Sequence, residues 1–332
     1  MTFACPVSIN WRGSIVSREG KRFMIIDSHT HLFPREYVKA LKEFGSPLRQ
    51  ELGAKFVEPE NRLKDMRESG IDRQVISITV PGVDTVKSRE STKLAKIVND
   101  RLANIAEKDN KFVSLASLPM LNPRDAVDEL RRATDNLGLK GIALLSNIAG
   151  KPLDRKEFWP IYEQASRMRI PLFIHPTFPT HEENFQAYSL TSVLGFPFET
   201  STAATRLVLS GLLDKMPDLI IVLAHLGGTI PYLVSRIDEG YRMFPACRQN
   251  IAKTPSTYLK TMFLDTVSFY APALNCAYRS WGADKLLLGS DYPYDWVGNL
   301  KMSVTTIEAL DISNEEKLKI TSQNIMKLLK IQ

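Results

Sequence analysis

Several residue classes and patterns are scarce in this chain of 332 residues, and each absence excludes a class of protein. No apolar run approaches the roughly 18 residues of a membrane-spanning helix, and the first residues lack the apolar core of a secretory signal. The three cysteines, Cys5, Cys247 and Cys276, lie far apart and form no CxxC pair, which excludes a disulfide framework and a cysteine-based metal site. We therefore expect a reduced, cytoplasmic protein without a membrane partner.

Charge of one sign is not concentrated anywhere in the chain. The formal net charge is +6, but basic residues are interleaved with acidic ones, as in Arg124-Asp125 and at 128–132. Without a long basic block we expect no nucleic-acid partner. A mildly basic surface is the preferred interpretation, and attraction of small anionic substrates is the alternative.

The chain repeats one theme: a short β-branched apolar run, a loop, and an amphipathic helix. With 44% hydrophobic and 24% charged residues, the composition is that of a globular protein with an ample core. Strands that alternate with helices imply a parallel sheet with right-handed crossovers. The predicted strands lie at 24–27, 74–80, 112–118, 141–145, 172–175, 220–224, 262–267 and 286–289, and helices are clearest at 89–108, 123–137, 156–168, 229–241 and 273–281.

Eight such repeats favour a closed (β/α)8 barrel of the TIM type over a doubly wound sheet. A doubly wound sheet usually carries a glycine-rich fingerprint in its first turn, whereas this first turn carries histidines. We predict one α/β barrel domain over residues 24–332, preceded by an N-terminal extension, 1–23, whose role is unknown. The barrel ends in a helical tail at 311–332, where Ser313 and Glu316 form a capping box.

Three connections are longer than a barrel requires. Residues 32–61 and 176–217 follow the first and fifth strands, so they leave from strand C-terminal ends, where barrel enzymes keep their active sites. We expect these two insertions to shape a substrate site. The third long connection, 244–260, precedes the seventh strand. We expect it either to cover the other end of the barrel or to bind a partner.

Histidine is also scarce, and its placement predicts a metal site. Four of the five histidines follow predicted strands one, five and six, and an aspartate follows strand eight. These C-terminal strand ends share one face of a barrel, and imidazole is the commonest protein ligand for a transition metal. The fifth, His181, lies in a polar loop where we expect it to be exposed. The predicted cluster consists of His29, His31, His175, His225 and Asp291.

Residues 24–330 resemble the amidohydrolase superfamily, and within it the branch that contains aminocarboxymuconate-semialdehyde decarboxylase (amidohydrolase 2). The stretches that carry the resemblance are IDSHTHLFP at 26–34, LPM at 118–120, LFIHP at 172–176, FET at 198–200, AHLGG at 224–228 and GSDYP at 289–293.

The resemblance implies that His29, His31, His175 and Asp291 bind one divalent ion, usually zinc and in some members manganese. Other amidohydrolases bridge a second metal with a lysine on strand four. Here that strand ends at Leu145 without one, so a mononuclear site follows. His225 is then free to act as the catalytic acid–base group, and Asp291 is catalytic as well as a ligand.

The branch mostly removes CO2 from unsaturated or aromatic carboxylic acids without an organic cofactor, and we expect that reaction here. Arg236 matches an arginine that reaches the neighbouring subunit's site, which implies a homodimer; a salt-bridged helix residue is the alternative reading. Arg49, in the first insertion, and Phe178, after the strand-five histidine, are candidate substrate contacts. A hydrolase or hydratase that acts on a small carboxylate, lactone or amide is the alternative function. A noncatalytic metal protein would need a damaged acid–base position, and His225 argues against it.

Overall fold

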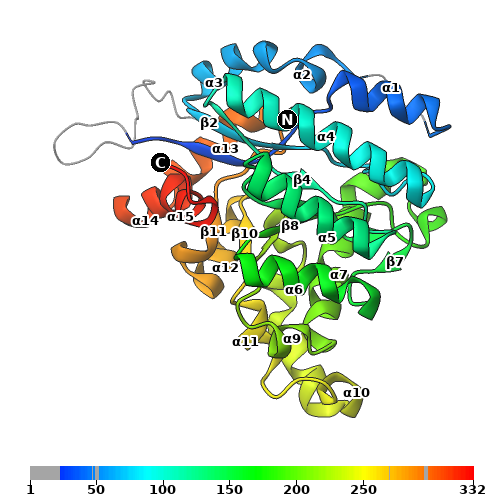
Figure 1. Cartoon of the computed structure of the whole chain (residues 1–332). Coiled ribbons are helices and arrows are strands. Elements are labelled where there is room, and N and C mark those ends of the chain that lie inside the picture. The colour runs from blue at the N-terminus through cyan, green and yellow to red at the C-terminus, as the bar shows by residue number, and fades with distance from the viewer. Residues whose placement is uncertain (1–22, 47, 49–51, 269, 295–297) are drawn as a thin grey trace.

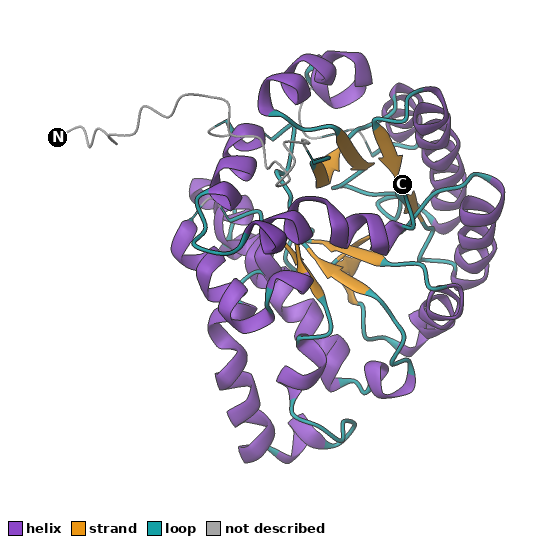
Figure 2. Cartoon of the chain, turned by 90° about the vertical axis from the view of Figure 1, so that its left-hand side faces the viewer, coloured by secondary structure: helices purple, strands orange, loops and turns teal. Residues whose placement is uncertain are grey.

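Parallel strands in chain order form the centre of the molecule and are surrounded by helices (Figure 2). The described residues of this computed structural model are 23–46, 48, 52–268, 270–294 and 298–332. Strand pairing runs from β1 through β2 to β3, and from β4 through β5, β8, β9 and β10 to β11. Their bounds are β1 Ile26–His31, β2 Arg73–Ser77, β3 Phe112–Ser114, β4 Ala116–Ser117, β5 Ile142–Leu145, β8 Leu172–His175, β9 Ile221–Leu223, β10 Phe263–Asp265 and β11 Leu286–Leu287, with a small antiparallel pair β6 Asn147–Ile148 and β7 Lys151–Pro152.

Backbone hydrogen bonds join the two ends of this series of strands. The amide of Ser28 donates to the carbonyl of Leu288 at 2.8 Å, and Thr30 pairs in parallel with Tyr292. Between β3 and β4 only Leu115 interrupts a single run, so the two short strands are one barrel position. The prediction of an eight-stranded (β/α)8 barrel is confirmed.

The predicted helices are present with ends that shift by a few residues. Asn122 caps α5, with Pro123 in the first turn, and Ser313 and Glu316 form the predicted capping box of α14. The α-helices are α1 Arg35–Glu43, α2 Ala54–Val57, α3 Leu63–Ser69, α4 Ser88–Lys108, α5 Pro123–Arg131, α6 Trp159–Met168, α7 Phe196–Leu209, α8 Leu212–Lys215, α9 Ile230–Met243, α10 Pro245–Arg248, α11 Pro255–Leu259, α12 Ala271–Trp281, α13 Asn299–Glu308, α14 Asn314–Leu318 and α15 Asn324–Leu329. Single π-turns continue α5 at Arg132–Asn136, precede α7 at Thr191–Gly195 and precede α15 at Lys319–Gln323, and short 3-10 turns lie at Pro59–Arg62, Lys156–Phe158, Glu182–Asn184, Ala187–Ser189, His225–Gly227 and Ala283–Lys285.

The end of the barrel at which the strands begin is filled by the C-terminal helix. Ile325, Leu328 and Leu329 of α15 pack into one buried cluster with interior side chains such as Ile26 and Leu287. The excursion at 244–260 lies elsewhere, because its helices α10 and α11 pack against α9 (Figure 1). That segment therefore does not cover the other end of the barrel, where α15 provides the apolar surface that the interior needs.

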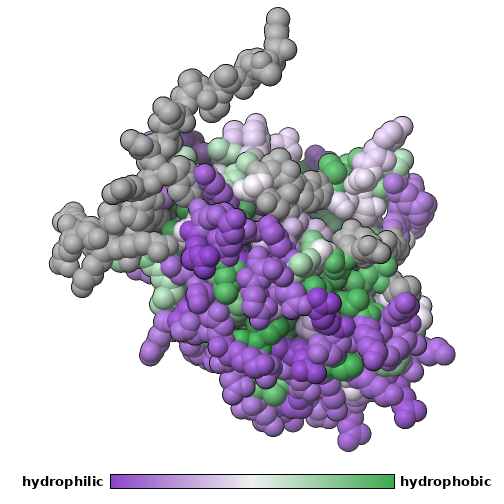
Figure 3. Space-filling model, turned by 90° about the horizontal axis from the view of Figure 1, so that it is seen from above, coloured by the Kyte–Doolittle hydropathy of each residue, from purple (hydrophilic) through white to green (hydrophobic). Residues whose placement is uncertain are grey.

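The surface is mixed in character. Seen from above, hydrophobic residues show between hydrophilic ones (Figure 3). Among the described residues, none of the helices combines the length and the apolar character that a membrane crossing requires.

Candidate active site

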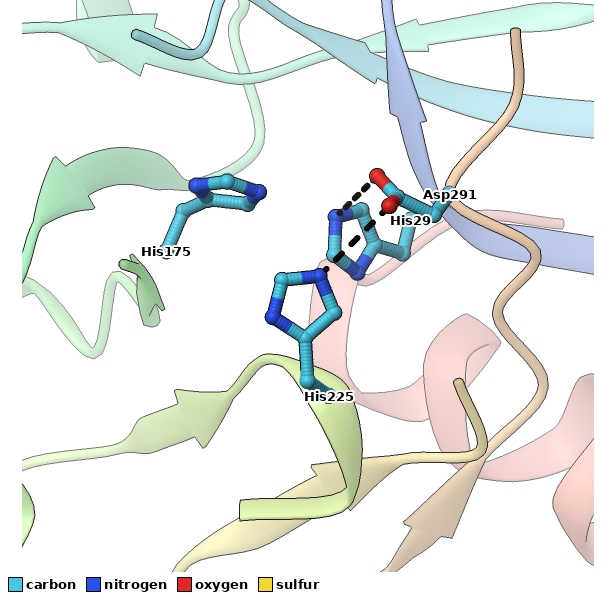
Figure 4. Close-up of side chains that lie close together, drawn as sticks. All are labelled: His29, His175, His225 and Asp291. Atoms are coloured by element: carbon cyan, nitrogen blue, oxygen red, sulfur yellow. Dashed lines mark ion pairs between the residues drawn. The ribbon is translucent and has the colours of Figure 1, made fainter. Parts of the chain in front are cut away.

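Strand ends bring the predicted histidines and aspartate together. Strand β1 continues to His31, so His29 and His31 lie within the strand, not just past an end at Asp27 as predicted. A register shift between Asp27 and Thr30 marks an irregularity in its pairing with β2. His175 is the last residue of β8, and the two remaining members, His225 and Asp291, follow β9 and β11. Figure 4 shows side chains from these different strands converging on one space.

The carboxylate of Asp291 is the centre of the cluster. Its Oδ1 lies 3.1 Å from Nε2 of His31 and 3.3 Å from Nε2 of His29, and those two nitrogens are 3.0 Å apart. The ligand atoms of His29, His175, His225 and Asp291 all lie within 4.8 Å of one another. All five predicted residues therefore meet at one point.

These spacings fit a metal ion. Ligand atoms bonded to a divalent ion at about 2.1 Å lie about 3.0–3.4 Å apart in octahedral or tetrahedral geometry. Once His29 has lost its proton, three electron-pair donors, from His29, His31 and Asp291, face each other at such separations, an arrangement that suits a cation between them. The cluster is thus a single-ion His/Asp metal site.

Contacts behind the imidazoles fix their tautomers. Nδ1 of His175 lies 2.7 Å from the carbonyl oxygen of Pro176, which can only accept, so Nδ1 carries the proton. Nδ1 of His29 lies 2.6 Å from Oδ2 of the buried Asp265. In both residues Nε2 is therefore the nitrogen that can hold a metal ion.

Burial and mutual charge set the ionisation of the cluster. Burial, together with the positive neighbour His29, lowers the pKa of His31 to about 4, and burial with neighbouring imidazoles holds the pKa of His175 well below its usual value. Burial alone would lower the pKa of His29 as well, but Asp265 and Asp291 outweigh it and raise the pKa to about 10. The imidazoles around Asp291 hold its pKa well below the usual range, against the effect of burial. His31, His175 and Asp291 are thus already in the form that binds a metal, whereas His29 must first lose a proton.

His225 differs from the other histidines. Its backbone is left-handed, with φ +53°, and its Nε2 lies 3.6 Å from Oδ2 of Asp291, farther than the nitrogens of His29 and His31. The side chain is 14% exposed and lines the cavity, and its buried Nδ1 has no partner among the described residues. A side chain so placed can exchange protons with a molecule in the cavity.

The cavity above the cluster has a volume of about 1220 Å³ and is lined by both predicted insertions. Leu48 and Leu52 come from the first insertion, and residues 177–180, 192–193 and 196–197 come from the second, so both insertions border the cavity. Phe178, the candidate substrate contact, lines the cavity, whereas His181 is exposed and lies beside Glu183. No lysine or arginine is among the described residues that line it.

The structure does not bring Arg236 to this cavity. Arg236 is exposed on α9 and is absent from the lining, and Arg49 lies outside the described residues. Within the described part of the chain no carboxylate pairs with Arg236, so its reading as a salt-bridged helix residue has no support.

Sequence reasoning missed two residues that touch the cluster. Asp265 holds His29, and the hydroxyl of Thr79 lies 2.8 Å from Nδ1 of His175. A signal for Asp265 is present, because it is an acidic residue within the predicted strand 262–267, near its C-terminal end.

Fold and site together define a metal-dependent barrel enzyme. The family model described as Amidohydrolase matches residues 26–331. The chain belongs to this amidohydrolase family, as its sequence motifs predict.

Its relatives are decarboxylases. The chain is 29% identical over 297 residues to the 2-amino-3-carboxymuconate-6-semialdehyde decarboxylase of Dictyostelium discoideum, with 82% of each chain covered. It is 31% identical over 288 residues to a gamma-resorcylate decarboxylase of Polaromonas sp., covering 81% of this chain and 87% of that one. The solved 5-carboxyvanillate decarboxylase of Novosphingobium aromaticivorans, complexed with manganese and 4-hydroxy-3-methoxy-5-nitrobenzoic acid, superposes with a TM-score of 0.84 at 26% identity, covering 96% of this chain and 99% of that one.

Proposed function

We propose that this protein is a mononuclear, metal-dependent, nonoxidative decarboxylase of an aromatic or unsaturated carboxylic acid. The observation that carries the proposal is the pairing of a His/Asp metal site with a separate cavity-facing imidazole, His225. Loss of CO2 needs two capacities, an electron sink at the substrate and a proton for the carbon that is left, and this pairing can supply both. The named activities of the relatives support the same reaction.

The ion would be held by His29, His31, His175 and Asp291. His31 is preferred to His225 as a ligand because its Nε2 lies 3.1 Å from the Asp291 carboxylate, compared with 3.6 Å for His225. Three imidazoles and one carboxylate suit zinc, and manganese is the ion of the solved relative. When bound, the ion supplies a Lewis acid that polarises a substrate oxygen.

His225 is the proton donor in this proposal. The step breaks the bond between the substrate carbon and its carboxylate, releases CO2 and forms a carbon–hydrogen bond with one proton. Nε2 of His225 faces both the cavity and Oδ2 of Asp291, so that carboxylate can orient the imidazole while the proton is transferred. Solvent that enters the open cavity can restore the proton.

Recognition of the acid would use apolar contacts within the chain and a cation from outside the described lining. Phe178 and the other apolar lining residues suit an aromatic ring or a conjugated chain. Arg236 of a second copy, or Arg49, would pair with a substrate carboxylate. We therefore propose a homodimer, and the exposed Tyr232 and Met243 on the same helix as Arg236 support an interface there.

The domain bounds and the cellular location are proposed from the sequence. The barrel domain is assigned to 24–332 and the preceding extension to 1–23. A cytoplasmic location is proposed because the cysteines are unpaired where described, at Cys247 and Cys276.

Metal analysis and an activity screen test the proposal. The purified protein should contain about one divalent ion per chain, and hydroxybenzoates and muconate-type acids should release CO2 or bicarbonate only when that ion is bound. Product formed in 18O-labelled water should contain no solvent oxygen. Incorporation of the label without CO2 release would instead establish a hydrolase or hydratase.

A further inference from the structure

Asp265 receives hydrogen bonds from both functional parts of the site. It ends β10 and is 2% exposed. Its Oδ2 accepts from Nδ1 of His29 at 2.6 Å and from the amide of His225 at 3.1 Å. Its Oδ1 accepts from the amides of Leu226 and Val267, each at 3.0 Å. Four donors from three segments of chain thus end on one carboxylate.

The contact with His29 sets the metal-binding side of the site. An ionised carboxylate can only accept, so the carboxylate holds the proton of His29 on Nδ1 and leaves Nε2 turned toward the cluster. Close packing keeps this pair together: a Cβ added to Gly289 would lie 3.0 Å from Cβ of His29 and 3.1 Å from Cβ of Asp265. The absence of a side chain at Gly289 therefore leaves room for the pair.

The contacts with the turn after β9 set the proton-transfer side. His225 and Leu226 both have left-handed backbones, with φ +53° and +56°, and φ is also positive at Gly227 and Gly228. Residues other than glycine rarely adopt a left-handed backbone unless other contacts stabilise it. The amides of His225 and Leu226 both point at the Asp265 carboxylate, so charge-assisted hydrogen bonds stabilise the turn that carries the His225 ring.

We propose that Asp265 is a positioning residue that couples the two halves of the site, because one carboxylate orients a metal ligand, His29, and holds the turn that places His225. The role of His225 in this inference rests on the proposed decarboxylase function, whereas the contacts with His29 and the turn do not. Asp265 itself is not among the residues that line the cavity.

Asp265→Asn tests the coupling because no orientation of the amide can replace the carboxylate. If the NH2 group takes the place of Oδ2, it faces the donors of His29 and His225; if it takes the place of Oδ1, it faces those of Leu226 and Val267. Either way two donors lose their acceptor while the size of the side chain is kept. Asp214→Asn is the control for removal of a structural carboxylate elsewhere.

Two readouts apply to the Asn variant whatever reaction the protein catalyses. Affinity for zinc, measured by chelator competition on the metal-free protein, should fall about 10- to 100-fold. Hydrogen–deuterium exchange of the amides of His225 and Leu226 should become faster. Asp214→Asn should change neither.

A third readout uses activity, with KM and kcat separated at saturating metal. The kcat of Asp265→Asn should stay at least about tenfold low while KM changes little, because excess metal restores the ion but not the place of His225. Full recovery of kcat with excess metal would overturn the coupling, and unchanged zinc affinity would overturn the role toward His29. If no acid is turned over by the unaltered protein, the proposed function fails while the first two readouts still decide the inference.

The unaltered protein provides a measurement that does not depend on how the variant folds. Because coupling is reciprocal, zinc binding at His29 should slow exchange of the His225 and Leu226 amides. Equal exchange with and without zinc would overturn the inference.

Discussion

At the residue scale, distance and hydrogen bonding separate two roles among chemically identical imidazoles. His29 and His31 crowd the Asp291 carboxylate, and the carboxylate of Asp265 lies behind His29. His225 stands farther from Asp291, faces the cavity and keeps an unpartnered buried Nδ1 among the described residues. The same side chain thus serves as a metal ligand where it is crowded and oriented, and as an acid–base group where it faces the substrate.

The first prediction concerns His225→Asn. Removal of a general acid typically costs about 10²- to 10⁴-fold in rate, so turnover should fall by at least about 100-fold. Metal content, measured by plasma mass spectrometry, should remain near one ion per chain because the proposed ligands are untouched. A variant that lost the ion would identify His225 as a ligand instead.

The second prediction follows from the raised pKa of His29. In the metal-free protein this pKa is about 10, so His29 is protonated at pH 7.5, whereas His31, with a pKa of about 4, is neutral. Zinc must therefore displace about one proton on binding, and its affinity should rise with pH by up to about tenfold per unit until the pKa of His29 is passed. Calorimetry in two buffers with different ionisation enthalpies counts the released protons.

A contradictory result in this experiment would be zinc affinity that is independent of pH between 7 and 9. That outcome would mean that His29 is already neutral in the metal-free protein. Asp265→Asn is the informative comparison, since removal of the adjacent charge should lower the pKa of His29 and reduce the number of protons released.

The residues that share a pattern, a polar side chain at the end of an apolar strand, could be predicted from the sequence, whereas the hydrogen-bond partners of those residues could not. His29, His31, His175, His225 and Asp291 follow apolar runs, so strand order alone predicts their meeting. The hydrogen bond from His29 to Asp265 joins residues 236 positions apart. The position of Asp265 near the end of a predicted strand marks it as a candidate, but no local pattern reveals that His29 is its partner. The tautomers and the pKa values depend on such contacts and on burial.

At the element scale, the turn after β9 has an unusual backbone, with positive φ at four successive residues, 225–228. A Cβ added to Gly228 would lie 2.1 Å from the carbonyl oxygen of Pro197 and 2.5 Å from Oγ of Ser201, both in α7. The hydroxyl of Ser201 also accepts from the amide of Thr229 at 2.8 Å, which ties α7 to the start of α9. Glycine at this position allows α7 to pack against the turn that carries His225.

The third prediction is that Gly228→Ala destabilises the protein and lowers activity. A left-handed backbone costs an L-residue about 1–2 kcal/mol, and overpacking against the α7 backbone adds about 1–3 kcal/mol. We expect a loss of about 2–5 kcal/mol in the free energy of unfolding, measured by urea denaturation. The matched control is Gly138→Ala, which also has positive φ but nothing within 4 Å of the added Cβ, so only the backbone cost should appear. Equal losses in the two variants would show that the contact with α7 is unimportant.

Element positions were predicted well where periodicity is strong, and their ends were not. Strand β8 has the predicted bounds, 172–175, because its run is uniformly apolar and ends at His175-Pro176. Strand β1 continues past the apolar run to His31, since pairing with β2 outweighs the polar character of 27–31. Helix α5 passes into a π-turn at Arg132–Asn136, a change in hydrogen bonding that apolar periodicity does not encode.

At the scale of the whole molecule, the two ends of the barrel are treated differently. The apolar side chains of α15 fill one end, whereas the other opens into a cavity bounded by the two insertions. The sequence predicts both the C-terminal helix and the insertions, but not that the helix covers the barrel interior. The cavity has no cationic side chain among its described lining residues, although the proposed substrate is an acid. A second copy of the chain is one source of the missing cation.

The last prediction tests whether Arg236 acts across a dimer. Arg236→Ala should lower activity mainly through a higher KM, because loss of an arginine–carboxylate pair weakens binding of the acid. His225→Asn should be nearly inactive for a different reason. If each site combines His225 of one copy with Arg236 of the other, mixing the two impaired variants under conditions that exchange subunits creates one intact site in each mixed dimer, which is measured at a substrate concentration well below the raised KM.

Activity of the mixture should therefore exceed the sum of the separate variants, and about a quarter of the unaltered activity is expected when half of the dimers are mixed and one of their two sites works. Sedimentation of each variant checks that dimers persist. An Arg236→Ala protein that is fully active alone, or a mixture no more active than its components, would show that Arg236 does not serve a second copy. In that case Arg49, the other arginine that the sequence offers for substrate binding, becomes the arginine to replace next, since the charge of the acid must still be balanced.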